Sequence, residues 1–224
     1  MTELDRFLLG ASQAFALLGE GPARSRTEHA VATFVAGARA WAAGELASID
    51  ELEPFAWEGA GLAAALRGEP EAPLQARPER ATLIFVGLGW ARTLTHAAIE
   101  APPATWLARF GESAWSLLDG QGFAAELFRR RLAERERPGS PIADHLDQGR
   151  GRALYFVHGG RPAAIARSVS ALGQARASAL WRGVGIASRF TDGLDEPTRA
   201  ELRAAGGDAL SEGERLALAL LGHG

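Results

Sequence analysis

Three ionisable residues have neighbours in the sequence that could suit them to acid–base chemistry. Glu58 and Asp119 each directly precede the first glycine of a Gly-x-Gly motif, and His158 follows the apolar run "YFV" and precedes two glycines. If both carboxylates enter one hollow, their pKa values shift and they can act as an acid and a base. Helix capping and solvent exposure are the simpler explanation for the carboxylates, and a hydrogen-bonded structural role is the simpler one for His158.

Two other groups have residue types that bind metals. His96 and Glu100 are four residues apart on a predicted helix, and His145 lies between Asp144 and Asp147 in "DHLD". A helical metal site needs further ligands, and no second pair with the spacing of His96 and Glu100 exists. We therefore expect a surface ion pair at His96 and Glu100, no metal site and no cofactor.

The absent residue types exclude whole reaction classes. The chain has no Cys, no Lys and no Asn, so all 24 of its basic residues are arginines. Thiolate nucleophiles, lysine Schiff bases, the phosphate-binding lysine of Walker motifs and Cys-based zinc sites are therefore excluded. The net charge of −3 argues against nucleic acid as a partner, because such affinity depends on neutralising phosphates. The basic run "FRRRLAERER" at 128–137 has interleaved glutamates, which is typical of a solvated helix end.

Four Gly-x-Gly motifs recur along the chain, in "WEGAGLA", "FVGLGWA", "LDGQGFA" and "WRGVGIA". None of them has the strand, helix and later acidic residue of a dinucleotide-binding loop. In each, an alanine follows the first glycine by four residues, which is one helical turn. The four pairs are Gly59/Ala63, Gly87/Ala91, Gly120/Ala124 and Gly183/Ala187. We therefore predict that they let neighbouring helices approach closely, with Trp57, Trp90, Phe123 and Trp181 packed beside them.

The rest of the pattern predicts a mainly α-helical protein, a helical repeat or bundle. Apolar residues from Leu4 to Leu18 recur with helical spacing, and "FVAGARAW" and "FVHGGRPA" lie 122 residues apart while their following W-x-G-x-G motifs lie 124 apart. These offsets indicate an internal duplication. We expect a first helical half at 1–137 with three of the motifs, a linker at 138–150, and a shortened second half at 151–224. At most one short strand is expected, near 153–158.

No stretch is apolar and long enough to span a bilayer, and the acidic N-terminus does not suit a secretory signal, so we expect a cytoplasmic protein.

These motifs, in the order "FAWEGAGLAAAL", "FVGLGWA", "LLDGQGFAAELF" and "LYFVHGGRP…LWRGVGIA", make the chain similar to a bacterial family of unknown function, the one numbered 1702. The resemblance covers residues 30–224. Members of that family are often encoded in enediyne and other polyketide gene clusters, which implies a helical, cytoplasmic protein of natural-product biosynthesis but no established reaction. The third motif of the family tends to be D-G-Y-G-F-H, so Gln121 and Ala124 depart from it here.

Two functions of different classes follow. The first is an accessory protein that binds or shelters a large apolar biosynthetic intermediate, or docks a partner enzyme, in a hollow lined by Trp57, Trp90, Trp115 and Trp181. The second is a cofactor-independent cyclase or isomerase that uses Glu58, Asp119 or His158. The sequence slightly favours the first function, because none of its residue patterns requires catalysis, and leaves the oligomeric state open.

Overall fold

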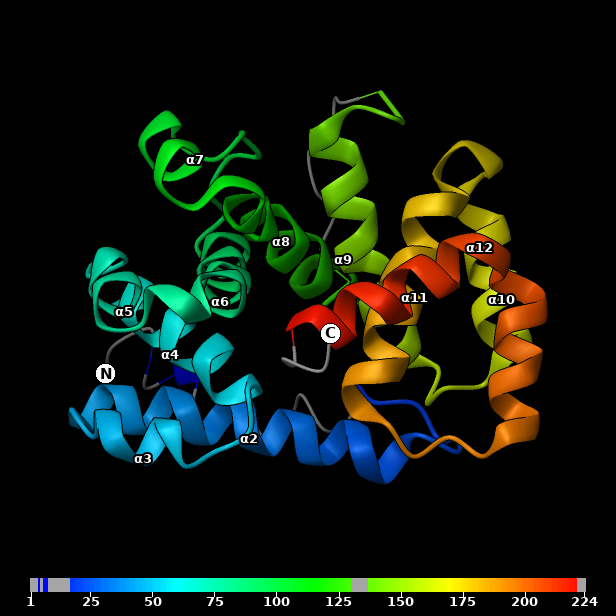
Figure 1. Ribbon diagram of the computed structural model, residues 1–224, viewed down its shortest axis with the longest axis horizontal. Helices are drawn as coiled ribbons and strands as arrows, with labels where there is room; N and C mark the ends of the chain where they lie inside the picture. Colours follow the sequence, from blue (N-terminus) through cyan, green and yellow to red (C-terminus); the bar gives the residue numbers. More distant parts are fainter. Residues whose placement is uncertain (1–3, 5, 8–16, 130–136, 221–224) are drawn as a thin grey trace. The chain divides into compact units, whose positions relative to one another are not determined.

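The computed structural model describes residue 4, residues 6 and 7, and residues 17–129 and 137–220. Within these ranges the chain is helical and contains no strand (Figure 1), which confirms the predicted fold class. The α-helices are α2 (Arg24–Ala43), α3 (Leu46–Asp50), α4 (Phe55–Leu66), α5 (Glu71–Ala76), α6 (Ala81–Leu94), α7 (Ala104–Phe110), α8 (Ser116–Leu127), α9 (Pro141–Val157), α10 (Pro162–Leu172), α11 (Ala177–Thr191) and α12 (Glu196–Leu220). Three 3-10 turns join them, η1 (Pro78–Arg80), η2 (Gly111–Trp115) and η3 (Gln174–Arg176).

The described residues form two compact units. The first contains residues 29–121 with residues 4, 6 and 7, and the second contains residues 17–28, 122–129 and 137–220. The division falls inside α2 and inside α8, so each of these helices contributes to both units.

Two helices of the first unit are buried on every side. All residues of α4 from Phe55 to Ala64 are buried, and so are all of α6 from Leu83 to Ala91. A helix that is apolar around its whole circumference belongs in a core. The Gly-x-Gly motifs lie inside these helices, as predicted, where glycine costs about 1 kcal/mol relative to alanine and must therefore be offset by packing.

The glycines of the first unit allow backbones to touch. A Cβ placed on Gly59 would lie 1.9 Å from the carbonyl oxygen of Phe34, and one on Gly37 would lie 2.0 Å from that of Ala56. In each direction the carbonyl belongs to the residue three positions before the partner glycine. We call this pairing a reciprocal glycine contact. Such closeness brings glycine Cα–H groups to carbonyl oxygens, a weak interaction that recurs between helices.

The same rule joins the next helices of this unit. Gly61 of α4 meets the carbonyl of Ile84, while Gly87 of α6 meets that of Glu58. The two glycines of one motif point to opposite neighbours, because two positions along a helix are about 200° apart. In the same way Gly89 of α6 and Gly120 of α8 form a reciprocal glycine contact. Each motif is thus a two-sided joint, whereas the sequence pattern indicated only one face.

In the second unit, two further reciprocal glycine contacts order α9, α11 and α12. Gly151 of α9 pairs with Gly183 of α11, and Gly185 of α11 pairs with Gly213 of α12; the added Cβ atoms would lie 1.9–2.1 Å from carbonyl oxygens. Gly122, in the middle of α8, meets the carbonyl of Leu146 of α9. The alanines that follow the first glycine of each motif by four residues are all at most 3% exposed, as their packing role requires.

The segment expected as a linker, 138–150, is instead the beginning of α9. Ser140 caps the helix, since its Oγ accepts a hydrogen bond of 3.2 Å from the Ala143 backbone N–H, and Pro141 occupies the first turn. Ala143 and Leu146 are fully buried. Prolines and glycines that resemble a linker therefore serve as a helix start and as a packing joint.

Two details of the predicted duplication differ in the structure. The segment near 153–158, where a short strand was allowed, continues α9 to Val157. "FVAGARAW" lies in the middle of α2, whereas "FVHGGRPA" ends α9 in two glycines with positive φ, Gly159 and Gly160. By the reciprocal glycine contacts, the counterpart of Gly37 is Gly151. The similarity between these two segments is therefore not structural, while the match of Trp57 to Trp181 agrees with the packing.

Most of the predicted first helix, from Leu4 to Leu18, and most of the basic run at 128–137 lie outside the described residues. Within the described part, no helix has the length and apolarity needed to cross a membrane.

Candidate functional site

Glu58 and Asp119 are buried but lie on helices that are not neighbours in the packing order. Glu58 is on α4 and 4% exposed, and Asp119 is on α8 and 2% exposed. Both occupy the position directly before a glycine that makes a reciprocal contact. In α6, which packs between these helices, that position holds Val86, whose carbonyl touches Gly120. The two carboxylates therefore belong to equivalent positions separated by an apolar one.

The corresponding positions of the second unit form a polar row. Arg182 donates from Nε to Oε1 of Gln148 at 2.8 Å, and its Nη1 is 3.6 Å from Oε1 of Glu212. Gln148, Arg182 and Glu212 directly precede Gly149, Gly183 and Gly213. Here the residues before the glycines contact one another across adjacent helices, which assigns this position a structural role.

His158 has a close side-chain partner. It ends α9, and its Nε2 lies 2.7 Å from Oγ of Ser168 on α10. Burial lowers the pKa of His158, and the neighbouring Arg161 and Arg167 lower it further. A lowered pKa favours the neutral imidazole, whose Nε2 accepts the Ser168 proton in the tautomer that carries its hydrogen on Nδ1. Both side chains are partly exposed, so a reactant can reach them.

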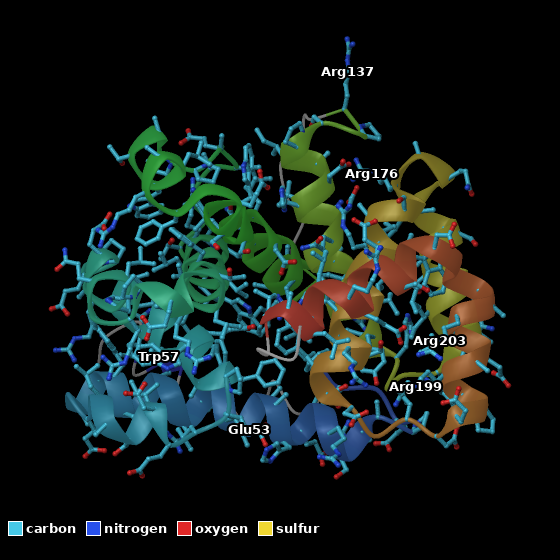
Figure 2. All side chains as sticks on the ribbon, viewed as in Figure 1. Glu53, Trp57, Arg137, Arg176, Arg199 and Arg203 are labelled. Atoms are coloured by element: carbon cyan, nitrogen blue, oxygen red, sulfur yellow. The ribbon has the colours of Figure 1, made fainter. Side chains whose placement is uncertain are left out.

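Asp147, the second acid of the "DHLD" motif, is hydrogen-bonded to two arginines. Its Oδ1 accepts hydrogen bonds from Arg176 at 2.8 Å and from Arg150 at 3.1 Å, while its side chain is 1% exposed. Figure 2 labels Arg176, which belongs to η3. Among the described residues no three His, Cys, Asp or Glu side chains are grouped so that they could hold a metal. The expectation that the protein needs no cofactor remains a prediction.

Four tryptophans were expected to line a hollow. In the structure, three of them are buried and one is half-buried. Trp57 (Figure 2), Trp90 and Trp181 are at most 8% exposed, and Trp115 is half-buried in η2. The Trp90 ring packs 4.8 Å from the Phe34 ring, centroid to centroid. The guanidinium of Arg77 lies 6.0 Å from the Trp57 ring centroid and pairs with Asp50. A ligand-binding role for these tryptophans stays a prediction.

Two cavities of the first unit are lined by other residues. The smaller, about 350 Å³, lies between the end of α2 and the end of α4 beside Trp41 and Arg67. The larger, about 390 Å³, is formed by α4, α6, α7, α8 and the segment 95–103. Its apolar wall includes Ala65, Leu88, Ala91, Trp106 and Leu117, and Arg92, Thr95 and Glu100 supply polar groups. A largely apolar cavity with few polar groups is the usual form of a small-molecule site.

Arg92 is held at the edge of this cavity by the segment that follows α6. Its Nη2 donates to the carbonyl of Ala98 at 2.8 Å, and its own carbonyl accepts from the N–H of Ala97. Glu100 is only a distant counterion, 3.9 Å from Nη2 and 71% exposed. Burial lowers the pKa of Arg92, and Glu100 partly opposes that shift. Within the described part of the chain, Nε and Nη1 of Arg92 have no hydrogen-bond partner.

Trp106 is the aromatic residue of the cavity that the sequence pattern missed. Its ring packs 5.2 Å from that of Phe85, and its Nε1 donates to Glu71. It stands outside every Gly-x-Gly motif, so the repeat gave no signal for it. It lies in α7, and Pro103 directly before this helix was a sign of a helix start but not of a cavity.

Comparison with protein families places the chain. The model of DUF1702, described as a protein of unknown function, matches residues 23–219. Since this range spans most of the sequence, the chain belongs to that family. No curated protein and no solved structure matches it.

Proposed function

We propose that this member of the DUF1702 family is a binding protein that holds an apolar small molecule, or the apolar end of a larger one, in the cavity beside α6 and α7. We further propose that it acts as an accessory protein of bacterial natural-product biosynthesis. The observation that carries the binding proposal is the cavity of about 390 Å³ with its apolar wall and three polar side chains. Specific ligand sites commonly have volumes of roughly 300–1,000 Å³ and this kind of lining.

Binding of an uncharged probe tests this proposal. We expect 1-decanol to bind the purified protein with one site by calorimetry. Thr95 lines the cavity but is exposed, so Thr95→Phe narrows the cavity without disturbing the core, and we expect it to weaken binding at least tenfold. Ala97→Phe adds the same bulk to an exposed neighbour outside the lining and is the matched control. Failure of 1-decanol to bind, or equal binding by Thr95→Phe, contradicts the proposal.

A second candidate function is proton transfer by His158, as in a cofactor-independent cyclase or isomerase. Its support is the hydrogen bond of 2.7 Å between His158 and Ser168 and the lowered pKa of the imidazole. A neutral imidazole near pH 7 is a competent general base. Glu58 and Asp119 remain candidates in the first unit, although their burial and their separation by α6 favour a structural role.

Complementation distinguishes this candidate from binding alone. In a strain lacking the gene, variants Ser168→Ala and His158→Gln should fail to restore the pathway product if the pair acts in catalysis. Ser170→Ala, at an exposed position of the same helix, is the control. Full restoration by both variants, with unchanged protein levels, removes His158 from consideration.

A further inference from the structure

From the unfilled donors of Arg92, we infer that the ligand of the α6–α7 cavity is an apolar carboxylic acid whose carboxylate binds the Arg92 guanidinium. The inference rests on the binding function proposed above and names the chemical class of the ligand.

The Arg92 guanidinium has more donors than the surrounding helices use. A guanidinium carries five N–H groups, and a half-buried one favours conditions in which they are paired. The side chain of Arg92 is 24% exposed, and among the described residues its one hydrogen bond runs from Nη2 to the carbonyl of Ala98. The N–H groups of Nε and Nη1 can therefore donate hydrogen bonds to a ligand in the cavity.

The positive charge of Arg92 is only weakly neutralised by the protein. The nearest carboxylate, Glu100, is 3.9 Å from Arg92 and faces mostly water, so it neutralises the arginine only weakly. A ligand carboxylate can instead form two parallel N–H···O bonds with a guanidinium, which are stronger than neutral hydrogen bonds. The site thus favours an anion over an uncharged polar head.

The apolar wall of the cavity indicates the chemistry of the rest of the ligand. Leu88, Ala91 and Leu117 are at most 3% exposed and form the inner wall, and Trp106 adds an aromatic surface. A saturated or polyene chain gains about 25 cal/mol for each Å² of apolar area that it buries. The ligand is accordingly amphipathic, with one acidic end and an apolar body.

Paired probes test the inference. At pH 8 and low salt, we expect decanoate to bind wild-type protein at least tenfold more tightly than 1-decanol. In Arg92→Gln the two probes should bind alike, because decanoate loses its charged partner. Arg92→Lys should keep part of the preference, because it retains the charge but not the bidentate geometry. Arg109→Gln, at an exposed position of α7 outside the lining, is the control and should behave as wild type.

The outcomes separate the two proposals. Binding of 1-decanol without a preference for decanoate, or a preference that survives Arg92→Gln, overturns the carboxylate inference and leaves the binding function standing. Binding of neither probe overturns both. Circular dichroism and thermal unfolding of each variant show that the fold is intact, and Arg92→Lys provides the test if Arg92→Gln proves unstable.

Discussion

Gln121 carries a buried amide that the packing leaves unsatisfied. The side chain is fully buried in α8, and neither Nε2 nor Oε1 has a hydrogen-bond partner in the described part of the chain. An unsatisfied buried polar group costs about 1–3 kcal/mol.

We therefore expect Gln121→Met, which has a similar shape without the amide, to raise the free energy of unfolding by about 1–2 kcal/mol. Urea unfolding measures it. Gln75→Met, at an exposed position, should change little. A less stable Gln121→Met would mean that the amide has a partner, such as a buried water, that the protein needs.

His158 gives the molecule a pH-dependent stability. Since burial and two arginines depress its folded-state pKa below that of the unfolded chain, the unfolded state binds the proton more readily. The wild type should thus lose stability as the pH falls below the usual histidine pKa of about 6.5. We expect His158→Gln, which can still bond to Ser168, to lose less stability than wild type between pH 7.5 and 5.5, measured by urea unfolding. Equal losses would show that His158 is protonated with no penalty.

At the scale of helices, the reciprocal glycine contacts make a prediction about pairs of substitutions. Gly37→Ala and Gly59→Ala each push α2 and α4 apart, since either Cβ would lie within 2.0 Å of a carbonyl oxygen. Each should destabilise the protein by about 1–3 kcal/mol, even though alanine is the better helix former. The double variant should cost clearly less than the sum, because the first substitution already opens the interface.

Gly59→Ala combined with Gly183→Ala is the control, because these two contacts lie in different units. Their costs should add within about 0.5 kcal/mol, as for distant sites. Additive costs for Gly37→Ala and Gly59→Ala would contradict the idea that both glycines serve one interface.

Much of this helical order could be predicted from the sequence, and the reasons for the failures are physical. Spacing placed Gly59, Gly87, Gly120 and Gly183 in helices, because glycine and alanine four residues apart mark a packed face. Gly149 and Ala153 follow the same rule, but arginines and the adjoining "PGSP" hid this fifth motif. Proline and serine before a helix resemble a linker in sequence, and the burial of Ala143 and Leu146 distinguishes the two.

The candidate site was less predictable than the fold. The cavity combines residues of α4, α6, α7 and α8 that are up to 52 positions apart, from Ala65 to Leu117. Their convergence depends on how segment 95–103 turns after α6, where His96 adopts a positive φ of 58°. A single sequence carries no strong signal for such a turn, because non-glycine residues adopt this conformation rarely. Trp106 and Arg92 therefore became candidates only once the turn was known.

At the scale of the whole molecule, the two units share helices. The division between them falls within α2 and within α8, so unfolding either unit breaks a helix of the other. We expect a single cooperative unfolding transition, with Gly59→Ala and Gly183→Ala both lowering its midpoint. Calorimetry measures the transition, and thermal unfolding followed by tryptophan fluorescence and by far-UV circular dichroism shows whether the two signals change together. Two separate transitions, each moved by only one variant, would mean that the units unfold independently.

The reciprocal glycine contacts also distinguish the positions that helix packing requires from the segments between them, whose length can differ. Paired glycines are 22 residues apart for Gly37 and Gly59 but 31 for Gly89 and Gly120, with the same close approach. The longer interval holds segment 95–103, α7 and η2, which close the cavity. The interval between paired glycines thus differs within this chain while the close approach stays the same, so a change of loop between two glycines can alter ligand specificity without moving the helices. Exchanging residues 92–115 between family members should transfer ligand preference while the melting temperature stays close to that of the host.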